Sequence, residues 1–158
     1  MVASGYDVRC SVIAIRDHAV LLVHRTRDDQ DDWVLPGGNP HEGESMTACA
    51  RRELLEETGI SANLSRVAFV VESVPPGSGR RVLDIVFAAT EPILGRERSR
   101  EAGLEPHFVP AGQLAALNLR PALAGQLNGI LDPGPHGYAA YVGNIWREPA
   151  APEPSQGT

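Results

Sequence analysis

GNPHEGESMTACARRELLEETGI, residues 38–60, is the stretch of sequence that decides the fold of this chain. Its first residues favour turns, and residues 46–57 are mostly strong helix formers. Ser45 suits the N-cap of a helix, and Gly59 suits the left-handed residue that ends one. The stretch therefore predicts a loop followed by a single helix.

Three glutamates share one side of this predicted helix. Glu56 and Glu57 follow Glu53 by three and four residues, which are the spacings of neighbours on a helix face. Like charges at such spacings repel each other by roughly 0.2–0.5 kcal/mol per pair on an exposed helix. A positive group must offset this repulsion, and a hard divalent cation with oxygen ligands is the obvious candidate.

Apolar residues flank the acidic face on both sides. Ala50 and Leu54 lie on one flank, and Ala48 and Leu55 lie on the other. We expect a helix with this pattern to be wedged between two layers of the fold.

The rest of the chain alternates apolar, β-branched runs with turn signals, which predicts strands before and after the helix. The first two strands are expected to pair as a hairpin. The expected strands are residues 8–15, 19–24, 63–74, 81–90 and 106–110, with a further extended segment at 138–146.

Helices are predicted again near the C-terminal end, at residues 111–117 and 121–131, after a charged surface loop at 91–105. This order of elements favours an α+β sandwich with a mixed sheet over regular strand–helix alternation. We expect one domain over residues 5–147 and a disordered, Pro-rich tail at 148–158.

The composition is that of a single globular domain. The chain has 158 residues, of which 42% are hydrophobic, and it carries a net charge of −6. This balance argues against a surface for nucleic acids or anionic membranes. The sequence has no signal-peptide pattern and no apolar run near the ~20 residues of a membrane span, so we expect a cytoplasmic protein. The two cysteines do not make a disulfide framework.

The pattern from Gly38 to Ile60 resembles the Nudix box, which is written G-x5-E-x7-R-E-U-x-E-E-x-G-U with U aliphatic. Gly38, Glu44 and the run RELLEETGI at residues 52–60 fill every specified position. A less specific resemblance extends over residues 7–131.

The resemblance implies an α/β/α sandwich whose helix presents glutamates to Mg²⁺ or Mn²⁺. The implied reaction is hydrolysis of a nucleoside diphosphate linked to another group, in which metal ions screen the phosphates and activate water. The implied metal ligands are Glu53, Glu56 and Glu57, and Glu44 is a further ligand or a support of the ligands. Arg52 would orient a glutamate.

The general base is left open by the resemblance, because family members carry it either in the box or in a loop before the last strand. Glu97, Glu101 and Glu105 all fall in that loop of this chain. Glu101 is the favoured candidate, because its place seven residues before Phe108 resembles the spacing of the loop glutamate in family members that cleave nucleoside triphosphates.

Four residues outside the helix are candidates for substrate binding. Gly37 and Gly38 permit either a positive φ or close approach of the backbone to a ligand. Arg25 and Arg27, at the end of a predicted strand, are candidates to contact phosphate. The alternative for both arginines is a place on the exposed surface.

The substrate is set outside the box, and three hypotheses stay open. The first is ADP-ribose or a related nucleotide sugar, because Pro75 and Pro76 resemble a feature of ADP-ribose-cleaving members, although they also make a natural turn. The second is a (d)NTP, cleaved with release of pyrophosphate. The third is a module that senses a nucleotide without turnover. A homodimer is compatible with these hypotheses, and nucleic acid is disfavoured as a partner.

Overall fold

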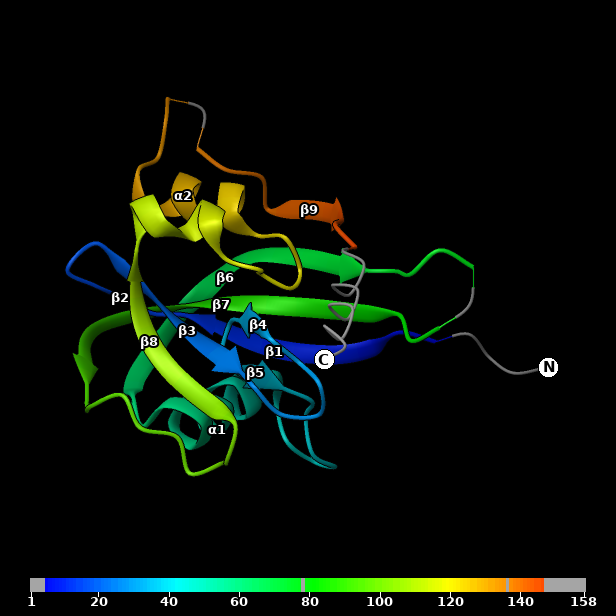
Figure 1. The fold of residues 1–158 in the computed structure, drawn as a ribbon, viewed down its shortest axis with the longest axis horizontal. Coiled ribbons are helices and arrows are strands. Elements are labelled where there is room, and N and C mark those ends of the chain that lie inside the picture. Colours follow the sequence, from blue (N-terminus) through cyan, green and yellow to red (C-terminus); the bar gives the residue numbers. More distant parts are fainter. Residues whose placement is uncertain (1–4, 78, 136, 147–158) are drawn as a thin grey trace, which may run out of the picture.

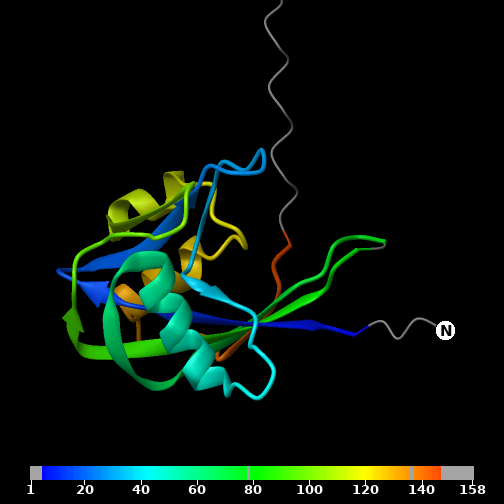
Figure 2. The ribbon, with the colours of Figure 1, turned by 90° about the horizontal axis from the view of Figure 1, so that it is seen from below.

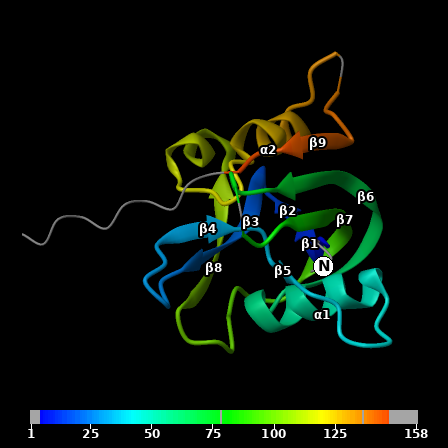
Figure 3. The same ribbon diagram turned by 90° about the vertical axis from the view of Figure 1, so that its right-hand side faces the viewer.

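The computed structural model describes residues 5–77, 79–135 and 137–146. Two β-sheets form the middle layer, with helix α1 (Met46–Thr58) on one face and the helices η1 (Ala111–Ala116) and α2 (Ala124–Leu131) on the other (Figure 1). Figure 2 shows α1 in front of the strands, and Figure 3 shows the helices on opposite sides of them. The predicted α+β sandwich with a mixed sheet is confirmed.

The larger sheet is mixed. Across it lie β5 (Gly37–Gly38), β1 (Asp7–Ile13), β7 (Val82–Leu94), β6 (Ser61–Ser73) and β9 (Tyr141–Asn144), in that order. The β1 strand is parallel to β7 and antiparallel to β5, whereas β6 is antiparallel to β7 and parallel to β9.

The smaller sheet is antiparallel and is organised around β3 (Ala19–Arg25). This strand pairs along its whole length with β8 (Leu104–Pro110), and it also pairs with β2 (Ile15–Arg16) and β4 (Asp32–Val34).

Side chains that alternate along these strands divide the core into two clusters. In β3, Leu21 packs toward α1, whereas Val20 and Leu22 pack toward η1 and α2. Such alternation is expected of strands that are buried on both faces. The cluster under α1 contains both cysteines of the chain, Cys10 and Cys49, and each is fully buried.

The predicted hairpin between the first two strands is wrong in its main part. The β1 strand pairs with β5 and β7, and only β2 and the start of β3 form a hairpin. Its turn consists of Asp17 and His18, whose φ angles are 50° and 60°. Two left-handed residues in succession are typical of a two-residue hairpin loop. The chain thus passes from one sheet to the other between Ile13 and Ile15.

The expectation that α1 is wedged between two layers is also wrong. Ala50 and Leu54 are fully buried, whereas Ala48 is exposed and Leu55 is 48% exposed. One flank of the helix packs on the sheets, and the other faces solvent.

Other bounds differ from the predicted ones by a few residues. The segment predicted as a helix at 111–117 is the 3-10 helix η1, α2 begins at Ala124, and β7 continues to Leu94 inside the predicted loop. The extended segment near the C-terminal end is present as β9. The tail at 148–158 lies outside the described residues. Among the helices of the described part of the chain, none is long and apolar enough to cross a membrane.

Candidate active site

Helix α1 begins and ends at the residues that its sequence predicts. The Ser45 hydroxyl accepts a hydrogen bond from the Ala48 N–H at 3.1 Å. Gly59 adopts a φ of 72°, and its N–H donates to the Leu55 carbonyl at 2.9 Å. The two caps fix the ends of the helix, and its glutamates therefore have fixed places beside β5.

Arg52 holds three of the acidic side chains together. Its Nε and Nη2 atoms donate to the two oxygens of Glu44 at 2.8 and 3.0 Å. Its Nη1 atom donates to Glu53 at 2.8 Å and to Glu56 at 3.2 Å. Charge-assisted, two-pronged contacts of this kind are among the strongest polar contacts in proteins. Arg52 is therefore a positive group that offsets part of the repulsion on the acidic face, and its contact with Glu56 is the i,i+4 ion pair that their spacing allows.

The same contacts control the ionisation of Glu44. Hydrogen bonds from Arg52, and then the hydrogen bond from the His41 N–H, lower the pKa of Glu44 to about 2. In turn, the hydrogen bond to Glu44 raises the pKa of Arg52 above its ordinary value. This geometry favours Glu44 as the support of Arg52 over Glu44 as a metal ligand.

Glu57 has a different environment from the other glutamates. Its Oε2 atom accepts a hydrogen bond from the Gly37 N–H at 3.1 Å. Burial raises the pKa of Glu57 to about 7, although the charge of Arg9 and the Gly37 N–H act to lower it. A half-buried carboxylate with so little compensation favours a nearby cation.

Gly37 and Gly38 are required because other atoms of the protein approach them closely, and neither has a positive φ. A Cβ atom on Gly37 would lie 2.4 Å from the Cys10 carbonyl oxygen. A Cβ atom on Gly38 would lie 2.3 Å from Glu53 Oε1. Gly38 thus leaves the space in which the Glu53 carboxylate lies.

Among the three loop glutamates, Glu101 is the one placed at the site. Its Oε2 atom is 2.9 Å from Arg27 Nη1, and its charge contributes to the raised pKa of Glu57. Glu97 and Glu105 are exposed. Arg27, predicted as a phosphate contact, therefore touches the candidate base.

A cavity of about 590 Å³ opens between the sheets next to this site. Residues of several elements line it, and the ones that carry charge, amide or aromatic groups include Arg9, Asn39, Asp84, Arg120 and Trp146.

A buried aspartate lies in the wall of this cavity. Asp84 is 5% exposed, and it faces Arg9 across the parallel pair of β1 and β7, with 3.6 Å between Arg9 Nε and its Oδ2. The Ser11 hydroxyl is 2.8 and 2.9 Å from the two carboxylate oxygens. Burial raises the pKa of Asp84 to about 6, although Arg9 and Ser11 act to lower it.

Arg25 borders the same cavity but is bound to a second buried aspartate. Its Nε and Nη2 atoms donate to Asp32 at 2.7 and 2.8 Å, and Asp32 is 2% exposed. Arg120 Nη1 is 3.5 Å from the same carboxylate. Arg25 therefore neutralises a buried charge, which the exposed-surface alternative did not foresee.

Sequence patterns did not point to Arg9, Asp84, Arg120 or Trp146. A usable signal was present for two of them. Arg9 interrupts the apolar first strand, and Asp84 interrupts the apolar strand of residues 82–94. Opposite charges inside two apolar strands indicate that the strands are neighbours with a polar pocket between them.

The acidic side chains of α1 offer oxygen donors that suit a divalent cation. Among the described residues, no three acidic, histidine or cysteine side chains already stand around one point. Glu53, Glu56 and Glu57 each use one oxygen in a hydrogen bond, and their other oxygens accept none from the described residues. Three carboxylates with free oxygens on one helix face match the ligand preference of Mg²⁺ or Mn²⁺.

A family model described as the NUDIX domain matches residues 5–127. The chain belongs to the NUDIX family. Its box and fold, expected from the resemblance, are thereby confirmed, while the roles of single residues stay predictions.

Curated relatives match this NUDIX chain over part of their length. An "8-oxo-(d)GTP phosphatase" of Mycolicibacterium smegmatis is 42% identical over 62 residues, which are 39% of this chain and 19% of that protein. An "RNA pyrophosphohydrolase" of Novosphingobium aromaticivorans is 38% identical over 64 residues, 39% of this chain and 38% of that protein. The chain therefore spans well under two thirds of these relatives.

Solved structures share the fold. A MutT protein from Methanosarcina mazei superposes with a TM-score of 0.67 at 24% identity, and the match covers 84% of this chain and 96% of that one. A Streptococcus suis protein described as an ADP-ribose pyrophosphatase gives 0.64 at 21% identity, covering 87% and 99%. At these identities the likeness concerns the fold.

Proposed function

We propose that this NUDIX protein hydrolyses a phosphoric anhydride bond in a nucleotide, with Mg²⁺ or Mn²⁺ held by Glu53, Glu56 and Glu57. The observation that carries the proposal is the difference in surroundings between the glutamates of α1. Arg52 contacts the first two glutamates, whereas Glu57 is half-buried with a pKa raised to about 7.

The cation, when bound, would screen phosphate charge and lower the pKa of a bound water. The protein's own groups would do the rest. Glu44 and Arg52 orient the ligands, and Gly38 leaves room for the Glu53 carboxylate. Glu101, which is held by Arg27, would accept the proton of the attacking water.

The nucleoside part is assigned to the cavity of about 590 Å³, because it adjoins the loop that starts the box. Trp146 offers a ring for stacking, and Asn39 and Asp84 offer hydrogen-bonding groups. The free volume falls within the range of small-molecule pockets.

The first candidate substrate is ADP-ribose or a related nucleoside diphosphate sugar. Pro75, whose position resembles that of ADP-ribose-cleaving members, lines the cavity, and Arg80 and Arg120 lie there for a second anionic group. The second candidate is a (d)NTP, and the printed name of the Mycolicibacterium relative supports it.

The test is a panel of nucleotides incubated with the protein and Mg²⁺. AMP and ribose phosphate from ADP-ribose would support the first candidate, and NMP with pyrophosphate would support the second. Tight binding of one nucleotide without turnover of any would overturn the catalytic proposal in favour of a sensing module. Addition of a chelator to an active sample is the control, because activity that survives it would overturn the role of the cation.

A further inference from the structure

Four arginines of the described residues have no partner for their side chains. Within the part of the chain that the structure describes, every other arginine makes an ion pair, a hydrogen bond or a contact with an aromatic ring. The four that make none, each of them exposed, are Arg51, Arg96, Arg98 and Arg100.

These four arginines border two surface hollows on the solvent side of α1. Arg51 borders one surface hollow of about 420 Å³. Arg96, Arg98 and Arg100 border a second hollow of about 340 Å³. Leu55 belongs to the walls of both, so that the hollows meet at this residue. We call this surface the arginine patch.

The backbone explains why three of the arginines lie together. The loop after β7 is attached to the end of α1, with the Arg98 N–H donating to the Thr58 carbonyl at 2.7 Å and the Arg100 N–H to the Glu56 carbonyl at 3.5 Å. Residues two apart in extended chain point the same way. The alternation in GRERSRE thus sends the arginines to the patch and Glu101 toward the candidate active site.

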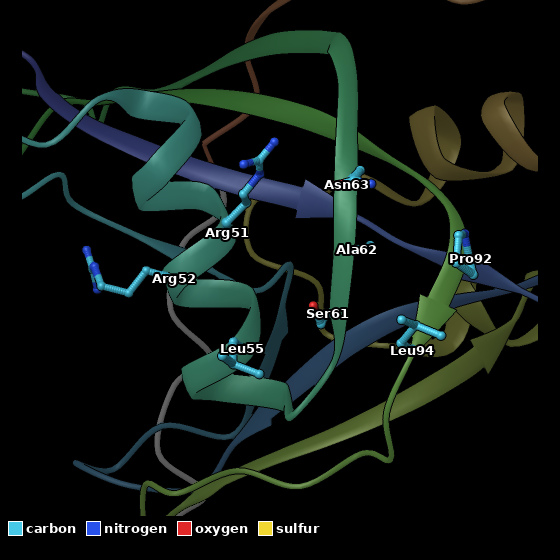
Figure 4. Close-up of a pocket in the computed structure, with 8 residues that line it drawn as sticks. All are labelled: Arg51, Arg52, Leu55, Ser61, Ala62, Asn63, Pro92 and Leu94. Carbon is cyan, nitrogen blue, oxygen red and sulfur yellow. The ribbon is translucent and has the colours of Figure 1, made fainter.

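Apolar side chains are mixed with the charges. Figure 4 shows Leu55 on α1 facing the start of β6, with Pro92 and Leu94 on the end of β7 beyond it. Leu55 is 48% exposed and Leu94 is 56% exposed. Apolar residues of this size next to unpaired guanidinium groups are typical of a surface that a partner covers.

We propose that the arginine patch binds an acidic polypeptide segment that carries an apolar side chain. Guanidinium groups take carboxylates in a two-pronged geometry, and the leucines take the apolar anchor. The patch also concentrates unpaired positive charge on a chain whose net charge is −6, which orients an acidic partner toward this face.

Nucleic acid fits the patch less well. Surfaces for single-stranded nucleic acid combine basic groups with aromatic rings on which the bases stack. The walls of the two hollows contain arginine, aliphatic and small polar residues and no aromatic ring.

The test measures binding of a fluorescent synthetic peptide that contains several glutamates and two leucines. Its affinity for the wild type is compared with that for the triple variant Arg96→Gln/Arg98→Gln/Arg100→Gln. We expect the triple variant to bind the peptide about tenfold more weakly or worse, since three exposed charge pairs are lost. Arg66→Gln, an exposed arginine on β6 outside the patch, is the matched control and should bind like the wild type.

Further measurements identify the partner class. Leu55→Ser should weaken peptide binding, and a peptide with serines in place of its leucines should bind the wild type more weakly. The proposal is overturned if the triple variant or Leu55→Ser binds as the wild type does, or if an oligouridylate of equal charge binds more tightly than the peptide. A concentration-dependent dimer that the triple variant abolishes would also overturn it, because the partner would then be a second copy of this chain.

Discussion

Glu57 and Glu53 are four residues apart on one helix, yet their carboxylates meet different surroundings. Arg52 holds Glu53 at 2.8 Å, whereas a backbone N–H of Gly37 holds Glu57 at 3.1 Å and burial raises its pKa to about 7. One carboxylate is already neutralised by the protein, and the other has most to gain from an added cation.

Substitution of Glu57 tests this difference. Glu57→Gln keeps the size of the side chain and removes its negative charge, so we expect turnover to fall by roughly a thousandfold with the fold intact. Steady-state kinetics with circular dichroism measures both. Glu97→Gln, in an exposed position of the same loop as Glu101, serves as the control. Near-wild-type turnover by Glu57→Gln would remove it from the ligand set.

The two glycines of β5 allow a second test at single residues. An alanine at position 38 collides with the movable end of Glu53, whereas an alanine at position 37 collides with the backbone of β1, including Ser11 Cα at 2.8 Å. Gly38→Ala should therefore lose activity while keeping most of its stability. Gly37→Ala should lose about 1–3 kcal/mol of its free energy of unfolding and therefore unfold at a clearly lower denaturant concentration. Equal stability of the two variants would contradict this assignment.

Asp84 makes stability depend on pH in the direction opposite to an ordinary ion pair. Its pKa in the folded chain, about 6, exceeds the value of 3.8 for the free group. The contribution of Asp84 to the free energy of unfolding is therefore fully present below pH 3.8 and is lost as pH rises through 6. Across this range the free energy of unfolding falls by roughly 3 kcal/mol.

Comparison with a neutral variant isolates this effect. Relative to the wild type, Asp84→Asn should gain stability as pH rises from about 4 to 7, because it has no proton to lose. Chemical denaturation of both proteins across this range measures the difference. A constant difference between the two curves would show that burial does not raise the pKa of Asp84.

At the scale of elements, α1 and the loop after β7 form one unit. The carbonyls of Thr58 and Glu56 at the end of the helix receive N–H groups of this loop. Gly59 makes the contact possible, since a Cβ atom there would lie 2.7 Å from the Arg96 carbonyl oxygen. The position of Glu101 thus depends on the end of the helix.

Gly59→Ala should separate the loop from the helix. Gly59 has a φ of 72°, and Gly43 has a similar φ of 75° but open space around its Cα. Both alanine variants carry the cost of a left-handed alanine, about 1 kcal/mol. Only Gly59→Ala adds the collision, so we expect it to be the less stable and the less active. Activity of Gly59→Ala equal to that of Gly43→Ala would contradict the coupling.

The elements also show where sequence reasoning succeeds and where it stops. The caps of α1 were readable because Ser45 and Gly59 act on residues next to them in the chain. The pairing of β1 with β7 was missed, because Arg9 and Asp84 lie far apart in the sequence and only their opposite charges point to it. The hairpin prediction failed for the same reason, because adjacent strands were assumed to pair.

The candidate site likewise has one part that the sequence predicts and one part that it does not. Arg52 and the glutamates of α1 come from one continuous stretch, and their spacing places them. The cavity that would hold the nucleoside is built by β1, β7 and the segment that ends at Trp146. Its residues follow from tertiary pairing, which periodicity and turn signals do not encode.

For the whole molecule, the site lies where the two sheets and α1 meet. A cation bound there would hold these elements together. Mg²⁺ should raise the melting temperature of the wild type, because a ligand that binds the folded state stabilises it by mass action. The same concentration should shift Glu57→Gln much less. Differential scanning fluorimetry with and without chelator makes the comparison, and equal shifts in both proteins would place the cation elsewhere.

The two buried cysteines beneath α1 can report the transient separation of this helix from the sheet. Cys10 and Cys49 are the only thiols of the chain, both are shielded completely, and burial raises the pKa of Cys49 to about 12. A thiol reagent at neutral pH therefore reacts only when the helix lifts from the sheet. The rate of labelling reports these openings without any engineered residue, and a nucleotide or metal that holds the helix on the sheet should slow the labelling.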